Sequence, residues 1–404
     1  MPKRLKIGVL SLSFLIVLLV VLGGLGVHAA SNNNDGAYRQ LGVYSEVLSR
    51  IRTEYVEEPN FSAVTSGALH GLLDSLDANS SYLNPDEYKF YKSHQNDGRA
   101  NVGATISRRF GYAAVVSVLP GGPADKAGIQ TGDIIEAIEG KSTHEMSLAA
   151  VEEQLAGKQG SNIEFSVVRP GKAEPQKITI TRDNVVIPGT TDKIIEDGIA
   201  DIQPVTLTKG KAQEVASKIR EEQKKGAKKL ILDLRNVSEG DATEAAAVAN
   251  LFLNHGTITY LQGQKYPKQT LVAEPQKAIT TLPLVVLVNR GTAGPGEIVA
   301  AAILDNNRGD LVGDKTFGSG SIQKVIDIPD GSALILSVAK YYTPSGKAIE
   351  DNAVTPNVVV ASNIDDLLPD DEDGAAAPAP QEKPKQQKDD DQLRRAVEVL
   401  KARS

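Results

Sequence analysis

Apolar runs of strand length alternate with helical patterns along the second half of the chain. Residues 229–235 and 283–289 are almost unbroken apolar runs, which predict buried strands. Helical spacing of apolar positions at 211–225 and 244–253 predicts a helix before and after the first strand. This alternation is typical of a mainly parallel sheet covered by helices, so the predicted fold class is α/β.

Further elements extend this region at both ends. A helix at 297–304, a short strand at 309–313 and a long strand at 333–342 follow the second buried run. Two helices are predicted ahead of the region. One covers 64–76, and the other has a single apolar face formed by Leu41, Tyr44, Val47, Leu48 and Ile51.

The C-terminal part changes character. Residues 361–388 are acidic, then Ala/Pro-rich, then Lys/Gln-rich, which predicts a disordered linker because no core can form from this composition. Residues 389–404 regain helical spacing and predict a short helix that docks on its own domain or on a partner, the first being the simpler interpretation.

Residues 98–184 carry a second pattern. An apolar strand at 113–119 precedes GGPADKAGIQTGD at 121–133, in which turns are expected at Gly128 and Gly132. Strand, helix and strand patterns follow. This order of short helix, glycine turns and strands resembles a PDZ domain, a module that binds C-terminal tails.

The N-terminus predicts export. Lys3, Arg4 and Lys6 precede an apolar run at 7–27, and the small residues near Ala29 fit a cleavage site. Residues 1–30 are therefore a signal peptide, or an uncleaved membrane anchor, because 21 apolar residues also suffice to span a bilayer. Either reading places the rest of the chain in the periplasm or in another extracytoplasmic, membrane-associated location.

The composition of the chain excludes several classes of function. The 404 residues have a net charge of −7, which gives no basic footprint for nucleic acid. Cysteine is absent, so disulfides and thiolate chemistry are excluded. No His/Asp/Glu group has metal-ligand spacing, and neither a metal nor another cofactor is expected.

Two motifs point to a family. Residues 288–297 read VNRGTAGPGE and residues 314–323 read DKTFGSGSIQ. They resemble the carboxyl-terminal processing peptidases (tail-specific proteases), in which N-x-G-[S/T]-A-S-x-x-E supplies a serine nucleophile and T-F-G-K-G-x-x-Q supplies a lysine base 25 residues later. The corresponding positions here are Gly294, Ser319 and, for the glutamine, Gln323. The resemblance covers residues 40–360 and implies helices at 31–97, a PDZ domain at 98–184 and an α/β peptidase-type core at 185–360.

The same resemblance predicts an altered oxyanion region. Pro295 follows the nucleophile position and has no N–H to donate. DLRNVSEG at 233–240 matches the family's D-L-R-x-N-P-G-G, so Glu239, next to Gly240, brings a carboxylate near the developing negative charge. Loss of a nucleophile or its base alone costs on the order of 10⁶ in rate. A pseudoenzyme is therefore expected.

Peptide binding is the function expected to remain. In the family the PDZ loop holds a tail's carboxylate in a nest of backbone N–H groups. The matching loop and the facing helix supply Asn101, Val102, Gly103, Ala104, Ile106, Val151 and Leu155 as candidates, although the apolar members also fit ordinary core positions. The expected partners are C-terminal tails of exported or unfolded proteins, and an active peptidase that this protein regulates. The alternative is an active serine-type endopeptidase using displaced groups such as Thr292 or Ser319.

Overall fold

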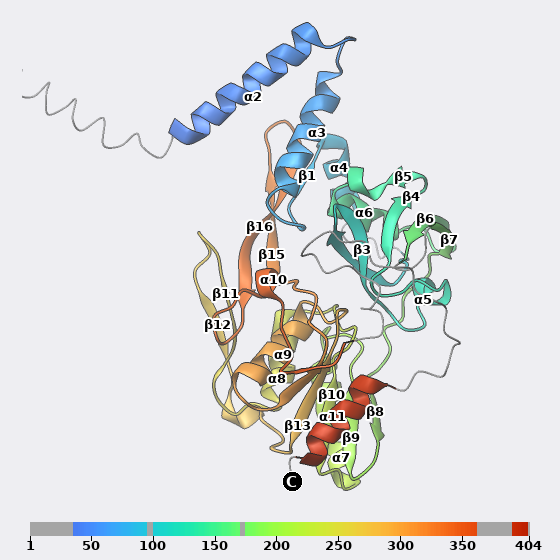
Figure 1. The fold of residues 1–404 in the computed structure, drawn as a ribbon, viewed down its shortest axis with the longest axis vertical. Coiled ribbons are helices and arrows are strands. Elements are labelled where there is room, and N and C mark those ends of the chain that lie inside the picture. Colours follow the sequence, from blue (N-terminus) through green and yellow to red (C-terminus); the bar gives the residue numbers. More distant parts are fainter. Residues whose placement is uncertain (1–34, 95–99, 170–173, 362–389, 403–404) are drawn as a thin grey trace, which may run out of the picture. The chain divides into compact units, whose positions relative to one another are not determined.

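The computed structural model describes residues 35–94, 100–169, 174–361 and 390–402 (Figure 1). The chain divides into two compact units, 1–68 and 69–404. The first contains α2 (Asp35–Glu54) and the start of α3 (Phe61–Asp74). No helix among the described residues has the length and apolarity needed to cross a membrane. The predicted signal or anchor at 1–30 and most of the predicted linker lie outside the described residues.

The PDZ part of the second unit is a six-stranded antiparallel sheet with a small core. Its strands are β2 (Ala104–Arg109), β3 (Tyr112–Val118), β4 (Ile134–Ile138), β5 (Lys141–Ser142), β6 (Asn162–Val168) and β7 (Gln176–Thr181). The helices are α5 (Pro123–Lys126), η1 (Thr143–Glu145) and α6 (Leu148–Leu155). Gly128 and Gly132 have φ angles of 81° and 90°, which explains why glycine occupies the two predicted turns.

The α/β core is built on a second six-stranded sheet, ordered β17-β14-β13-β10-β9-β8. Its strands are β8 (Thr191–Ile194), β9 (Ile199–Gln203), β10 (Lys229–Asp233), β13 (Leu284–Val288), β14 (Asp310–Gly313) and β17 (Val358–Val359). All neighbours pair in parallel except β8 with β9. The predicted mainly parallel sheet is therefore confirmed.

Helices cover both faces of this sheet. On one face α7 (Lys211–Lys224), α8 (Ala242–Asn250) and α9 (Pro295–Asp305) enclose the largest apolar core of the protein. On the other face lies α11 (Asp391–Ala402), drawn in red in Figure 1. Its Val397 and Leu400 pack against the strands, and Arg235 bonds Asp390 at 2.8 Å. The C-terminal helix thus docks on its own domain.

A third, antiparallel sheet was not predicted beyond its longest strand. It comprises β1 (Ser81–Leu83), β11 (Thr257–Gln262), β12 (Gln269–Val272), β15 (Ser321–Asp327) and β16 (Ala333–Tyr342). The remaining short elements are α4 (Pro85–His94), η2 (Pro275–Lys277) and α10 (Ile349–Asn352). β15 starts directly after Gly320 and pairs with β16, so this sheet fixes the loop that carries Ser319.

Candidate functional site

A sharp turn between β13 and α9 forms the centre of the site. The five residues of β13 are fully buried, and the chain then reverses through residues 289–294 into the helix. The Asn289 side chain accepts N–H bonds from Gly291 at 3.0 Å and Asn236 at 2.9 Å. Ala293 donates its N–H to Val237 O at 3.0 Å. Hydrogen bonds therefore join the turn to the segment 233–240.

Gly294 sits at the tip of this turn in a strained conformation. Its φ is 51° and its ψ is −110°, a region that L side chains rarely adopt. A Cβ atom added there would lie 3.7 Å from both Ser238 O and Ser319 O, which is ordinary contact. The structure therefore brings Gly294 and Ser319 together, and the shape of the turn resembles the strained strand-to-helix elbow that exposes a nucleophile in other hydrolases.

A buried carboxyl group holds the two loops in place. Glu297 is 0% exposed and accepts N–H bonds from Gly294 at 3.0 Å, Gly318 at 2.9 Å and Ser319 at 2.8 Å. The Thr316 hydroxyl donates a further bond to it. Burial raises the pKa of Glu297 to about 7, while these donors act in the opposite direction. Glu297 is thus a structural link between the nucleophile position and the base position.

The predicted oxyanion residues lie on both sides of this turn. Pro295 is buried at the first position of α9, and the next amide, of Gly296, donates to Ala293 O at 3.0 Å. Gly240 has a φ of 142°, and a Cβ there would stand 2.2 Å from Leu207 O, so this position requires glycine. Neither Pro295 nor Gly296 offers a free amide to a developing oxyanion.

The neighbouring hydroxyl groups are hydrogen-bonded within the protein. Thr292 is 0% exposed and donates to Leu234 O at 2.8 Å. Ser321 accepts from the amides of Asn79 at 3.1 Å and Gln323 at 2.9 Å. Gln323 itself is exposed on β15. An amide or a carbonyl cannot act as the base that a serine nucleophile needs. Ser321 also hydrogen-bonds the carboxylate of Glu350.

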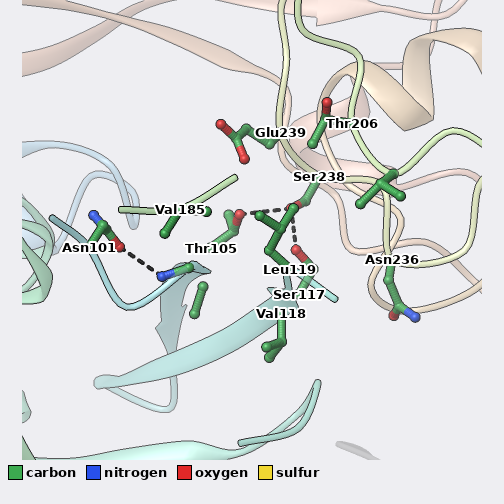
Figure 2. Close-up of a pocket in the computed structure, with 13 residues that line it drawn as sticks. Asn101, Thr105, Ser117, Val118, Leu119, Val185, Thr206, Asn236, Ser238 and Glu239 are labelled. Carbon is green, nitrogen blue, oxygen red and sulfur yellow. Dashed lines mark hydrogen bonds between the residues drawn. The ribbon is translucent and has the colours of Figure 1, made fainter. Parts of the chain in front are cut away.

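The PDZ part meets the core beside this turn. Ser117 and Ser238 share a hydrogen bond of 2.5 Å, and Ser238 donates to Thr105 at 2.9 Å (Figure 2). Thr131 donates to Asn236 at 3.2 Å. Strands β2 and β3 of the PDZ part are therefore bonded to the same segment, 236–238, that flanks Gly294.

A cavity of about 250 Å³ opens at this junction (Figure 2). Its lining from the PDZ part is Asn101, Gly103, Ala104, Thr105, Ser117, Val118 and Leu119. Its lining from the core is Val185, Val205, Thr206, Asn236, Ser238 and Glu239. The predicted PDZ loop and the predicted oxyanion segment thus contribute to one cavity.

Part of the predicted peptide-binding set is not in this cavity. Val102, Ile106, Val151 and Leu155 are all buried in the PDZ core, so in this structure the alternative that they are ordinary core residues holds. Their burial follows from the small size of the domain, whose two layers need these side chains to fill the space between them. Asn101, Gly103 and Ala104 do line the cavity.

The PDZ loop has a further feature that the sequence did not suggest. The Asn101 side-chain oxygen accepts the Gly103 N–H at 3.0 Å, so one backbone donor of the expected nest is already used. Sequence reasoning also missed Val185, Val205, Thr206 and Ser117. Val185, Val205 and Thr206 lie far from residues 101–106 along the chain, whereas Ser117 lies opposite Thr105 on the paired strand β3. No local pattern marks any of them as cavity residues.

The fold and the site together define a class of protein, in which a PDZ domain is joined to an α/β core with a strained strand-to-helix turn. Residues 198–360 match the model of peptidase family S41, and residues 115–169 match a PDZ domain model. The chain is 31% identical over 335 residues to a carboxy-terminal-processing protease of Bartonella bacilliformis, covering 82% of this chain and 77% of that protein.

Further relatives indicate the same family. Carboxy-terminal processing protease CtpA of Bacillus subtilis is 31% identical over 336 residues, covering 83% of this chain and 71% of that protein. The solved structure of a photosystem II D1 C-terminal processing protease has a TM-score of 0.66 and 28% identity, covering 79% of this chain and 86% of that chain. The protein belongs to the carboxyl-terminal processing protease family.

Proposed function

We propose that this family member binds C-terminal tails without cleaving them. The observation that carries the proposal is the turn at Gly294. The turn keeps the strained backbone, the helix start and the loop contact at Ser319, yet it presents no side chain at its tip. Covalent peptide cleavage needs an oxygen nucleophile within hydrogen-bond reach of a base, and this position supplies neither group.

The surrounding groups support a binding role. Thr292 is buried and bonded to a carbonyl, so it is not positioned to attack a substrate. The Ser319 N–H is bonded to Glu297, and a serine hydroxyl does not take up a proton near neutral pH. By contrast, the cavity beside the PDZ loop offers open volume next to residues 101–104, where a tail's carboxylate is expected.

The proposal includes location and partners. The basic residues and apolar run at the N-terminus favour export, and a periplasmic or membrane-associated protein would meet tails of exported or unfolded proteins there. A tail-binding protein that keeps a protease fold is also suited to deliver substrates to an active peptidase, or to withhold them from it. Both roles depend on tail binding.

Tail binding is tested with a matched peptide pair. Fluorescence anisotropy would measure binding of the full-length protein to one peptide with a free C-terminal carboxylate and to the same peptide with an amidated C-terminus. We expect binding of the free carboxylate and at least a tenfold loss on amidation, because a lost charge-assisted hydrogen bond is worth about 1.5–3 kcal/mol. Equal binding of both peptides, or no binding of either, contradicts the proposal.

An active endopeptidase is the second candidate, and the family relationship is what favours it. Its residual nucleophile would be Ser319 or Thr292. Peptide turnover that disappears in Ser319→Ala or Thr292→Ala, in a preparation free of other proteases, would establish this function and exclude the pseudoenzyme. We expect no turnover to measure.

A further inference from the structure

The face of the main sheet that α11 covers contains a buried carboxyl group. Asp201 lies on β9 two residues after Ile199, and its register partner on β10 is Ile231. Both isoleucines belong to the apolar cluster that packs against α11. Side chains two residues apart on a strand point to the same face, so Asp201 lies on this face as well. The residue is only 3% exposed.

The charge of Asp201 is weakly compensated. Its Oδ2 atom lies 3.3 Å from Nζ of Lys193, a mostly exposed side chain on β8. Its Oδ1 atom is buried and has no hydrogen-bond partner among the described residues. Burial and the negative charge of Asp233 on the next strand raise the pKa of Asp201 to about 6, while Lys193 and Arg235 act in the opposite direction.

The same charges hold the N-terminal end of α11. Arg235 donates from Nε and Nη2 to Asp233 at 2.9 Å and 2.6 Å, and from Nη1 to Asp390 at 2.8 Å. Asp390 also accepts a backbone N–H of α11 at 2.9 Å and so caps the helix. Against its own burial, the bond from Arg235 and the charge of Lys193 lower the pKa of Asp390. One cluster therefore joins β8, β9 and β10 to the start of α11.

The balance of charge in this cluster depends on the protonation of Asp201. When Asp201 is neutral, the carboxylates of Asp233 and Asp390 balance the cations of Arg235 and Lys193. When Asp201 is ionised, one negative charge is left unbalanced in a place that water does not reach. Such a charge is costly while the helix covers it and is solvated once the helix leaves.

The other charges on α11 do not restore this balance. Asp391 pairs with Arg394 at 2.6 Å, and Arg395 pairs with Glu398 at 2.8 Å. The positive end of the helix dipole already has the carboxylates of Asp390 and Asp391 beside it. Ionisation of Asp201 therefore disfavours the docked helix start.

The C-terminal end of α11 is held differently. Lys401 lies 3.0 Å from Glu196 and 3.0 Å from Asp197, whose hydrogen bonds raise the pKa of Lys401. Lys229 donates to the carbonyl of Leu400 at 2.7 Å. These contacts join cations to acceptors, with no unpaired buried acid among them, so the two ends of the helix should respond differently to pH.

We propose that α11 is a pH-sensitive latch on its own domain, in which protonation of Asp201 favours the docked helix and ionisation of Asp201 loosens the helix start. The latch has a route to the candidate site. Arg235 precedes Asn236, which donates its N–H to Asn289 at 2.9 Å and accepts from Thr131 of the PDZ part at 3.2 Å. Loosening α11 removes one of the bonds that hold this segment.

The sign and size of the effect follow from linkage. An ordinary aspartate titrates near about 3.9, below the value of about 6 for Asp201 under the docked helix. The released state therefore loses its proton at lower pH than the docked state, and rising pH favours release. Full return of Asp201 to the ordinary value would increase the equilibrium constant for opening by about tenfold between pH 5 and pH 8.

Hydrogen exchange of the full-length protein tests the latch. Mass spectrometry would follow the backbone amides of residues 391–402 from pH 5 to pH 8, with exchange times adjusted for the intrinsic pH dependence of amide exchange. We expect the protection of these amides to fall by up to about tenfold over this range. Protection that does not change with pH overturns the latch, and this result does not depend on the folding of any variant.

Two variants identify the group responsible. Asp201→Asn keeps the shape of the side chain and removes its ionisation, so the protection of α11 should no longer fall with pH. Asp86→Asn is the matched control: it makes the same change at an exposed carboxylate on α4 and should behave like the wild type. Circular dichroism confirms that both variants are folded. A fall of wild-type size in Asp201→Asn overturns the role of Asp201.

Discussion

Two neighbouring regions of this molecule, the turn at Gly294 and the cavity at Glu239, differ in how their polar groups are used. At the turn, the carboxyl group of Glu297 is completely buried and accepts bonds from four donors. In the cavity, Glu239 is without a partner among the described residues and faces open volume. One carboxyl group maintains a shape, and the other is available to a ligand.

The difference separates a carboxyl group that stabilises the fold from one that is open to solvent. A residue that satisfies several buried donors contributes to folding whether or not chemistry occurs beside it. Glu239 is exposed, so water solvates its carboxylate and the group is not needed to hold the fold. We therefore interpret the Gly294 turn as a framework that holds the fold, and we propose that the cavity is the place where a tail binds.

The same substitution at both glutamates tests this contrast most strongly. Glu297→Gln should lower the free energy of unfolding by about 3 kcal/mol, because its amide group opposes buried N–H donors that it cannot satisfy. Glu239→Gln should change it by no more than about 0.5 kcal/mol. Urea unfolding at pH 7.5 measures both, and similar losses in the two variants would remove the basis of the comparison.

The pH dependence of stability should also differ. The pKa of Glu297 is raised to about 7, whereas an ordinary glutamate in an unfolded chain titrates near about 4.3. Between these values the folded protein keeps a proton that the unfolded chain has lost, so the contribution of Glu297 to stability falls as pH rises through this window.

Urea unfolding of the wild type and of Glu297→Gln at intervals from pH 4.5 to 8 measures this effect. The unfolding free energy of the wild type should fall more steeply with pH than that of the variant. The difference in slope corresponds to at most one additional proton bound by the folded state. Asp201, whose pKa is raised to about 6, acts in the same direction in both proteins and cancels in the difference. Parallel curves would show that Glu297 is ionised in the folded state throughout.

Gly294→Ser should cause the next largest loss of stability. The added Cβ has room, but a φ of 51° with a ψ of −110° is costly for a side chain, so we expect a loss of about 1–3 kcal/mol. Gly189→Ser is the control, since a Cβ there meets nothing within 4 Å and its φ is not positive. Equal stability of the two variants would show that the turn is not strained.

Asn101→Asp should have the smallest effect on folding and a selective effect on binding. The aspartate can still accept the Gly103 N–H, but it replaces the Nδ2 donor with a negative charge. We expect roughly tenfold weaker binding of a tail with a free carboxylate, and little change for the amidated peptide. Equal weakening of both peptides would indicate a distorted loop instead.

Much of the fold followed from the sequence because hydrophobic periodicity reports burial directly. The strands that contain Leu232 and Val286, and the helices beside them, were predicted from apolar spacing alone. Strands β11 and β12 were missed, since their short, half-exposed segments carry little periodic signal. β11 pairs with β16, which is a tertiary contact, and β12 pairs with β11.

The site was predictable in its framework and not in its cavity. Gly294, Ser319 and Glu297 occur in motifs with fixed spacing, so the resemblance located them. The cavity depends on the approach of PDZ residues near 101 and 117 to core residues near 205 and 239, and the two groups are distant from each other in sequence. Whether Val102 and Leu155 face a groove or a core was also open, because apolar side chains suit both places. In the structure both side chains pack in the core of the PDZ part.

The most direct test of the central claim restores the missing groups. Wild type and the triple variant Gly294→Ser, Pro295→Ala, Ser319→Lys would be incubated with a tail peptide that both bind, and intact peptide would be followed by mass spectrometry. Our account predicts that the wild type leaves the bound peptide intact and that the triple variant cleaves it, because the framework already brings positions 294 and 319 together. Cleavage by purified wild-type protein would contradict it.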